Sequence, residues 1–260
     1  MRGRRNNHAS VKDDLVRVDP KHATGDREGE AFGPFPGELG AELEPEALAT
    51  MGLDLYGLLE HLASTRPIFH SEADFQHALA WQIQVENPAA RVRLETRPQR
   101  GIHLDLFVRL SDERIAIELK YLVARFEGVV GGEVFDLPNQ GAHDISRHDV
   151  VKDVVRVERL LATGLADSGW VIALSNDSNY WRPGTKVDPI DAMFRLHDGK
   201  SLSGVLQWNP RAGEGTTRGR DQPLPLQNVY TCGWSEYATV ISAAGRAVPF
   251  RHLAFAVVPR

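Results

Sequence analysis

Two acidic residues and a lysine interrupt a pair of apolar segments in the middle of the chain. Residues 102–109 alternate apolar side chains with Asp105, and residues 114–120 alternate them with Glu118 and Lys120. Strict alternation is the period of a half-buried β-strand. Charged groups on such strands are costly to shield unless they are paired or bind an ion. The pattern therefore predicts a β-hairpin that carries all three side chains on one face, where they could bind a divalent metal beside a phosphodiester.

The length of the turn decides whether these side chains meet. A connection of two residues (112–113) or of four would place Asp105 opposite Lys120 and make Glu118 its diagonal neighbour, within reach of one ion. An odd-numbered connection would separate the two carboxylates, because a slip of one residue moves every side chain of a strand to the other face. The hypothesis of a shared site therefore requires an even-numbered connection.

Two neighbouring carboxylates repel each other unless a positive charge lies between them. Mg²⁺ suits this position because it prefers oxygen ligands and usually binds one or two carboxylates together with water and phosphate; Mn²⁺ is the expected substitute. Lys120 would then orient the attacking water or stabilise charge on the phosphate. The alternative is a cross-strand ion pair between Lys120 and Asp105 or Glu118, worth about 0.2–1 kcal/mol.

A fourth acidic residue lies at the start of a predicted helix. Ser71, with Asp74 three residues later, has the pattern of a capped helix N-terminus, and Phe75 and Leu79 continue an inward-facing stripe. Glu72 stands at the head of that stripe. Its carboxylate either stabilises the helix N-terminus or joins the site, and the sequence leaves both interpretations open.

The remaining pattern predicts helix, three strands, helix and strand. A long helix between the hairpin and the last strand should act as a crossover, which makes that strand parallel to the one before the helix. The expected segments are a helix at 53–62, the capped helix from 71, strands at 91–96, 101–109 and 114–120, a mobile loop at 122–140, a helix at 144–162, a strand at 169–175, a loop at 209–228 and a closing strand at 250–258.

Composition limits the kinds of partner. The 260 residues have a net charge of −5, so any binding of nucleic acid would need a local basic patch. Six arginines near the hairpin could supply one, although solvated arginines on exposed strands explain each of them equally well: Arg91, Arg93, Arg97, Arg100, Arg109 and Arg114. The single cysteine, Cys232, precludes an intramolecular disulfide.

Other features bear on location and domain organisation. No apolar run approaches the ~18 residues of a membrane span, and no apolar region follows the basic N-terminus, so we expect a cytoplasmic protein without membrane contact. Residues 1–45 are polar and lack a sustained period, which predicts a flexible tail. Residues 46–260 are then expected to form a single domain.

These residues resemble the motif of the PD-(D/E)xK superfamily, the restriction-endonuclease-like nucleases, over about residues 68–176. Asp105 matches the first metal-binding acid of that family, Glu118 the second and Lys120 its catalytic lysine. Glu72 matches an additional acid that many members carry. One position departs from the pattern, because the Pro-Asp dipeptide of the family is replaced here by Leu104-Asp105.

The resemblance implies an α/β fold with a restriction-endonuclease-like core, in which helices flank a mixed central sheet and residues 177–260 form a C-terminal elaboration. It also implies a Mg²⁺-dependent nuclease with Asp105, Glu118, Lys120 and Glu72 in the site, the three acids as metal ligands. DNA is favoured over RNA, in restriction, defence or repair. Cutting both strands would require two sites and hence a homodimer.

The long helix adds a further expectation and an alternative. In related enzymes this helix approaches the substrate, which would involve the face with Gln140, His148, Lys152 and Arg156. A solvated helix face, on which Asp153 and Arg156 form an ordinary i,i+3 pair, is the simpler interpretation. Two other functions also remain open: a binding module on the same fold with weak or no cleavage, and an unrelated α/β protein whose hairpin charges form a surface ion pair.

Overall fold

A mixed six-stranded sheet organises the part of the chain that the structure, a computed structural model, describes, residues 52–260. The strand order is β1-β2-β3-β6-β12-β11. Its strands are β1 (Arg91–Thr96), β2 (Leu104–Leu110), β3 (Glu113–Leu122), β6 (Ser168–Ser175), β11 (Trp234–Ile241) and β12 (Ala247–Val257). β3 and β6 run parallel, whereas the other neighbouring pairs of this sheet are antiparallel.

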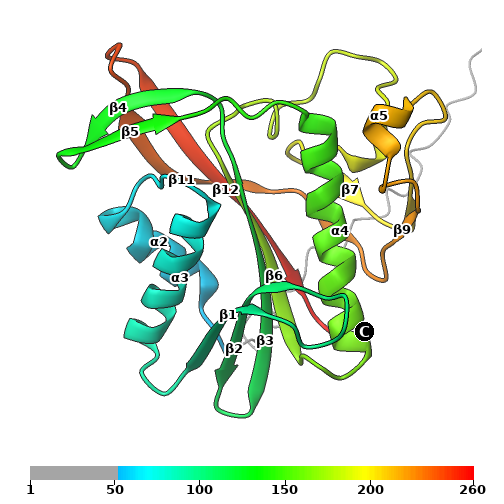
Figure 1. The fold of residues 1–260 in the computed structure, drawn as a ribbon, viewed down its shortest axis with the longest axis horizontal. Helices are drawn as coiled ribbons and strands as arrows, with labels where there is room; N and C mark the ends of the chain where they lie inside the picture. Colours follow the sequence, from blue (N-terminus) through cyan, green and yellow to red (C-terminus); the bar gives the residue numbers. More distant parts are fainter. Residues whose placement is uncertain (1–51) are drawn as a thin grey trace, which may run out of the picture. The chain divides into compact units, whose positions relative to one another are not determined.

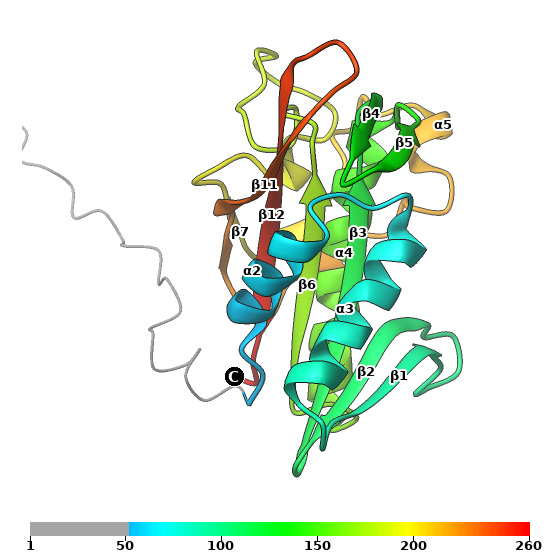
Figure 2. The same ribbon diagram turned by 90° about the vertical axis from the view of Figure 1, so that its left-hand side faces the viewer.

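Helices cover both faces of the sheet. The long helices are α2 (Leu55–Thr65), α3 (Glu72–Glu86) and α4 (His143–Ala162). α2 and α3 pack on one face and α4 packs on the other, as Figures 1 and 2 show. Each interface has its own buried apolar cluster, one under α2 and α3 and one under α4. The predicted α/β class, with helices flanking a mixed sheet, is therefore confirmed.

The predicted order of elements is found from α3 to β6. Ser71 caps α3, and its hydroxyl accepts a hydrogen bond from the Asp74 amide at 3.1 Å. The three strands β1, β2 and β3 follow, and α4 connects β3 to the parallel strand β6. Residues 168–175 are buried throughout, as expected for a strand with α4 on one side and the α2–α3 layer on the other.

The prediction of a mobile loop at residues 122–140 is wrong. A hairpin of β4 (Phe126–Val130) and β5 (Glu133–Leu137) occupies most of it. Gly131 and Gly132 have φ values of 60° and 86°, which is the backbone that a two-residue hairpin turn requires. Phe126 and Leu137 are paired across the hairpin and buried in the core. The glycines that suggested mobility therefore mark a turn.

The C-terminal third adds strands to the far edge of the sheet. β12 confirms the predicted closing strand, and β11, which the sequence pattern did not reveal, pairs with it at the edge. The predicted loop at 209–228 contains α5 (Glu214–Thr217). The smaller strand pairs are β7 (Ser201–Leu202) with β10 (Tyr230–Thr231) and β8 (Val205–Leu206) with β9 (Leu224–Pro225), and a short 3-10 helix spans Ala192–Phe194.

Two further expectations concern the N-terminal tail and membrane contact. The predicted flexible tail, residues 1–45, lies outside the described residues. Within residues 52–260, none of the helices has the length and apolar character needed to cross a membrane.

Candidate active site

The β2–β3 hairpin has an even-numbered connection, as the site hypothesis requires, but its register differs from the prediction. Leu110 pairs with Glu113, so the connecting residues are Ser111 and Asp112 rather than residues 112–113. Ser111 adopts a φ of 54°, which lets the strands reverse one residue earlier. Extending the register places Asp105 opposite Glu118, and the prediction that it lies opposite Lys120 is wrong.

The two strands separate at the site. Their paired residues end at Leu106 and Ile117, although β3 continues beside β6 as far as Leu122. At the first position beyond the ladder, one carboxylate oxygen of Asp105 accepts a hydrogen bond from the Leu119 amide at 2.7 Å. The side chain of Asp105 thus takes the place of a backbone partner and holds its carboxylate against β3, next to Glu118 and Lys120.

Helix α4 brings two further charged residues to the hairpin. The ammonium nitrogen of Lys120 lies 2.7 Å from Oδ2 of Asp153 and donates to the Leu119 carbonyl at 2.9 Å. One guanidinium nitrogen of Arg156 lies 2.5 Å from Oε1 of Glu118 and 2.9 Å from Oδ1 of Asp153. A chain of alternating charges therefore connects the sheet to the helix.

Asp153 is the residue that sequence reasoning missed. Its i,i+3 pair with Arg156 was foreseen, but the helix face was interpreted as solvated, whereas the Asp153 side chain is only 3% exposed. The spacing contained the signal. Asp153 stands three residues after Val150 and four before Val157, both of which are buried, so it belongs to the inward stripe of α4. An acid at such a position needs a partner, and Lys120 and Arg156 provide it.

Glu72 reaches the same end of the sheet from α3. Its carboxylate accepts a hydrogen bond from the Tyr121 amide at 2.9 Å. The residue as a whole is exposed, but its carboxylate lies over β3, where burial raises its pKa in spite of the nearby Lys120 ammonium. Glu72 therefore neighbours the site electrostatically and is not among the residues that line the pocket described next.

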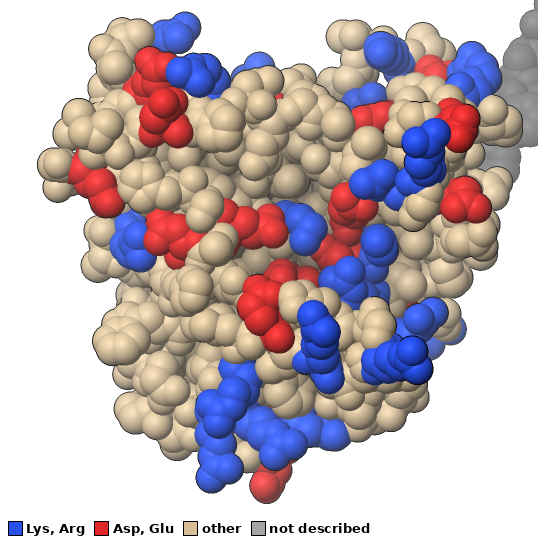
Figure 3. Space-filling view, in the orientation of Figure 1, with Lys and Arg blue, Asp and Glu red and all other residues tan. Residues whose placement is uncertain are grey.

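A pocket of about 350 Å³ opens between the hairpin, α4 and the segment after α5. Its lining is charged almost throughout: His103, Asp105, Glu118, Lys120, Asp149, Lys152, Asp153, Arg156, Arg218, Gly219 and Arg220. Three of the four predicted site residues are in this set. Figure 3 shows acidic and basic side chains mixed across the middle of the face that α4 and the hairpin share.

Burial makes two acidic groups of this pocket, Glu118 and Asp153, difficult to ionise. Burial, together with the Asp153 carboxylate, raises the pKa of Glu118 to about 9 even though Arg156 opposes the shift. Burial likewise raises the pKa of Asp153, against the effect of Lys120 and Arg156. For Lys120, burial acts to lower the pKa, but the Asp153 and Glu72 carboxylates outweigh it and the pKa rises. Lys120 is therefore an ammonium ion at neutral pH.

In this arrangement the acidic side chains face cationic side chains rather than a common centre. Among residues 52–260, no three histidine, cysteine or acidic side chains gather closely enough to form a ready-made metal-binding group. Oδ2 of Asp153 is buried and, although it lies near Lys120, makes no hydrogen bond of acceptable geometry. The contact of this oxygen is therefore the ion pair with the Lys120 ammonium.

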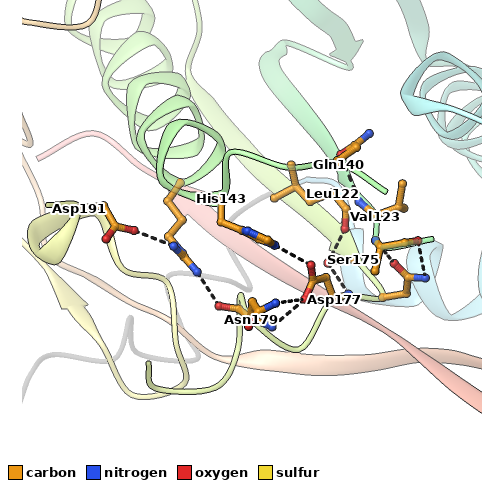
Figure 4. Close-up of polar contacts among 11 residues, drawn as sticks. Leu122, Val123, Gln140, His143, Ser175, Asp177, Asn179 and Asp191 are labelled. Carbon is orange, nitrogen blue, oxygen red and sulfur yellow. Dashed lines mark hydrogen bonds and ion pairs between the residues drawn. The ribbon is translucent and has the colours of Figure 1, made fainter. Parts of the chain in front are cut away.

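A second polar cluster fixes the start of α4 (Figure 4). His143 contacts Asp177 at 2.7 Å through its Nε2 atom. Arg147 donates to Asp191 at 2.6 Å and to the carbonyl of Asn179 at 2.7 Å. These bonds join the first turns of the helix to the segment that follows β6. They hold the helix in the position that brings Asp153 and Arg156 over the hairpin.

Comparison with models of known protein families and with curated proteins finds no match for this chain. The site must therefore be interpreted from its own geometry.

Proposed function

We propose that this protein is a Mg²⁺-dependent nuclease that hydrolyses phosphodiester bonds of DNA on a restriction-endonuclease-like core. The observation that carries the proposal is the meeting of Asp105, Glu118 and Lys120 in one pocket, where β2 and β3 separate. The motif resemblance was based on the sequence alone. The pocket adds independent support, because the corrected register brings the two carboxylates directly opposite each other.

The donor set fits a hard divalent cation. Asp105 and Glu118 supply carboxylate oxygens, and the carbonyl of Leu119 lies on the same edge. Lys120 and Arg156 are the cationic side chains in direct contact with Glu118 and Asp153. A divalent cation bound here would favour the ionised form of the buried acids, whose pKa burial raises. Mg²⁺ usually binds only one or two carboxylates and completes its shell with water and substrate phosphate, and Mn²⁺ shares this preference for oxygen ligands.

Asp105 and Glu118 would hold the metal, with Glu72 assisting through its charge. When bound, Mg²⁺ supplies charge neutralisation at the phosphate and lowers the pKa of a bound water. The chain's own contribution is positional. Lys120 remains protonated, so it acts as a hydrogen-bond donor to the attacking water or to a phosphate oxygen and does not act as a base. The α4 residue Asp153 holds that ammonium group in the pocket.

Exposed arginines on the same sheet face support a polyanionic substrate. Arg91 pairs with Arg109 across β1 and β2, and Arg93 pairs with Phe107, two residues from Asp105. All three arginines are exposed, and Figure 3 shows basic side chains gathered at the end of the molecule formed by β1 and β2. They would contact backbone phosphates and set the register of the strand without reading its sequence.

The direct test is a cleavage panel with plasmid, linear DNA, single-stranded DNA and RNA, each with Mg²⁺, Mn²⁺ or EDTA. We expect metal-dependent cleavage of DNA that Glu118→Gln and Lys120→Ala each abolish. Matched controls are Glu236→Gln and Lys186→Ala, which change exposed residues outside the pocket and should leave cleavage intact. Cleavage that persists in both site variants, with folding verified by circular dichroism, would refute the assignment.

One observation favours a second candidate, a nucleic-acid-binding module without cleavage. Glu118 and Asp153 are already paired with Arg156 and Lys120, and a site that stays closed in this way would not hydrolyse anything. Salt-dependent binding of DNA, together with no cleavage in any metal, would select this alternative.

A further inference from the structure

In the pocket, the cationic side chain of Arg156 lies between two acidic side chains. A single guanidinium nitrogen of Arg156 touches two buried carboxylates, Glu118 at 2.5 Å and Asp153 at 2.9 Å. A cation that bridges two carboxylates in this way occupies the role that a divalent metal would fill in the proposed nuclease. We propose that Arg156 is an internal counter-ion that competes with the divalent cation for Glu118, an inference that rests on the proposed function.

The exposure of the two partners shows which of them can move. The Glu118 side chain is 1% exposed and fixed in the centre of the sheet, between β2 and β6. The Arg156 side chain is 25% exposed and lines the pocket. Exchange of counter-ions therefore requires only that Arg156 swing toward the pocket mouth, with no change in the sheet.

Asp153 can keep the Arg156 guanidinium near the pocket after it has left Glu118. It contacts Arg156 across one turn of α4 and contacts Lys120 on β3. When Glu118 turns to a metal, Arg156 still has a buried carboxylate within reach and stays near the pocket. A guanidinium held there would face the substrate phosphate, for which its planar fork of donors is suited.

Competition of this kind explains why the acids do not form a preformed metal group. An unpaired carboxylate buried at the position of Glu118 would be strongly unfavourable. Arg156 offsets part of that cost while no metal is bound, and its removal would leave Glu118 open to the cation. Loss of a metal ligand weakens metal binding, whereas loss of Arg156 should make metal binding tighter.

The experiment is a titration of the full-length protein with Mn²⁺, in which free Mn²⁺ is measured by electron paramagnetic resonance. We expect Arg156→Ala to bind Mn²⁺ more tightly than the wild type, by a factor of roughly 5–150, the size of typical coupling free energies between two bound groups. Arg156→Lys should lie between the two, because an ammonium lacks the fork that bridges both acids. Arg159→Ala, which removes an exposed arginine one turn along the same helix surface, is the matched control and should bind like the wild type.

Thermal unfolding in EDTA provides the second measurement. Without metal, Arg156→Ala should have a lower melting temperature than the wild type. Saturating Mn²⁺ should raise the melting temperature of the variant by more than that of the wild type. If Arg156→Ala does not fold, Arg156→Lys alone still tests the order of affinities.

The outcomes separate the two proposals. Wild-type or weaker Mn²⁺ affinity in Arg156→Ala, with measurable binding in the wild type, overturns the counter-ion role and leaves the nuclease proposal standing. Absence of Mn²⁺ binding in every form overturns metal dependence itself, and the counter-ion role with it.

Discussion

Helix α4 contributes residues to two charged clusters whose acidic groups differ in ionisation. At its start, hydrogen bonds from His143 and Asn179 outweigh the burial of Asp177 and hold the pKa of that carboxyl below its usual value. In its middle, burial outweighs the ion pairs and raises the pKa of Glu118 and Asp153. The Asp177 side chain is also more exposed, 9% against 1% for Glu118 and 3% for Asp153, so the difference in pKa reflects both burial and the donors that each acid contacts.

Under the proposed function, the cluster at the start of the helix is structural and the cluster in its middle is the reactive one. Hydrogen-bonded charge pairs around Asp177 and Arg147 join the helix to the segment after β6, although Nε of Arg147 is buried without a hydrogen-bond partner. In the middle cluster, the buried Oδ2 of Asp153 contacts the Lys120 ammonium, and Glu118 has a single cationic partner, Arg156. Perturbed ionisation in a charged pocket is typical of functional sites. The following predictions test whether the two clusters divide stability and chemistry in this way.

The largest expected effect is on cleavage. Asp105→Asn keeps an oxygen that can accept the Leu119 amide, so the site should retain its shape but lose a charged metal ligand. We expect cleavage to fall on the order of 10³-fold, measured as the initial rate on plasmid DNA with Mg²⁺. Asp177→Asn, in the cluster at the start of α4, is the comparison and should keep most of the activity. Equal losses in both variants would remove the distinction between the clusters.

The next effect is on stability. Arg147→Met breaks a buried pair and leaves Asp191, itself buried, with Arg195 as its remaining cationic partner. Loss of one member of a buried pair typically costs about 3–5 kcal/mol, and urea unfolding followed by circular dichroism measures it. Lys186→Met, an exposed cation in the same neighbourhood, should change stability little. A loss in Arg147→Met no larger than in this control would show that the cluster does not anchor α4.

A smaller effect concerns pH. The pKa of Glu118 is raised from 4.5 to about 9 in the folded protein, so the native state binds a proton that the unfolded chain releases. Stability of the metal-free protein should therefore fall as pH rises between these values. Melting temperatures in EDTA across this range measure the slope, and Glu118→Gln should flatten it. A melting temperature that rises with pH in the wild type, relative to Glu118→Gln, would contradict the assignment.

The smallest effect is expected at an exposed pair outside both clusters. Arg114 holds Asp167 with two side-chain hydrogen bonds and lowers its pKa to about 2. The ion pair contributes to folding stability above pH 3.8, the ordinary pKa of the carboxyl group. This contribution is lost as the pH falls from 3.8 to about 2. Because both side chains are partly exposed, solvent screening keeps the gain small. Asp167→Asn should shift acid unfolding only slightly toward neutral pH, and a shift as large as that of Arg147→Met would be unexpected.

Much of the fold could be predicted because its signals are local. Apolar alternation marked β2 and β3, the Ser71 cap marked α3, and the valine stripe marked α4. The register could not be fixed in the same way, because the chain reverses at Ser111 in a left-handed conformation that non-glycine residues rarely adopt. The predicted partner of Asp105 was therefore two residues too far along β3, Lys120 in place of Glu118. An error of two residues leaves Asp105 on the predicted face of the sheet.

The site was only partly predictable for a different reason. Asp105, Glu118 and Lys120 lie on adjacent strands and can be related through pairing rules. Asp153 and Arg156 meet them only after α4 folds back over β3, which brings together residues more than 30 positions apart. The helix face with Asp153 was interpreted as solvated, and although the spacing places Asp153 on the inward stripe, it does not show which strand residues the side chain faces.

The hydrogen bond from the Leu119 amide to Asp105 has a consequence for protein engineering. The same carboxylate that would bind the metal also keeps the two strands apart at the mouth of the pocket. Shape and chemistry are therefore linked at this position, and a library that varies Asp105 would change both at once. Attempts to alter the strength of polyanion binding should leave Asp105 untouched and vary the exposed arginines of β1 and β2, whose side chains can change without disturbing the opening between the strands.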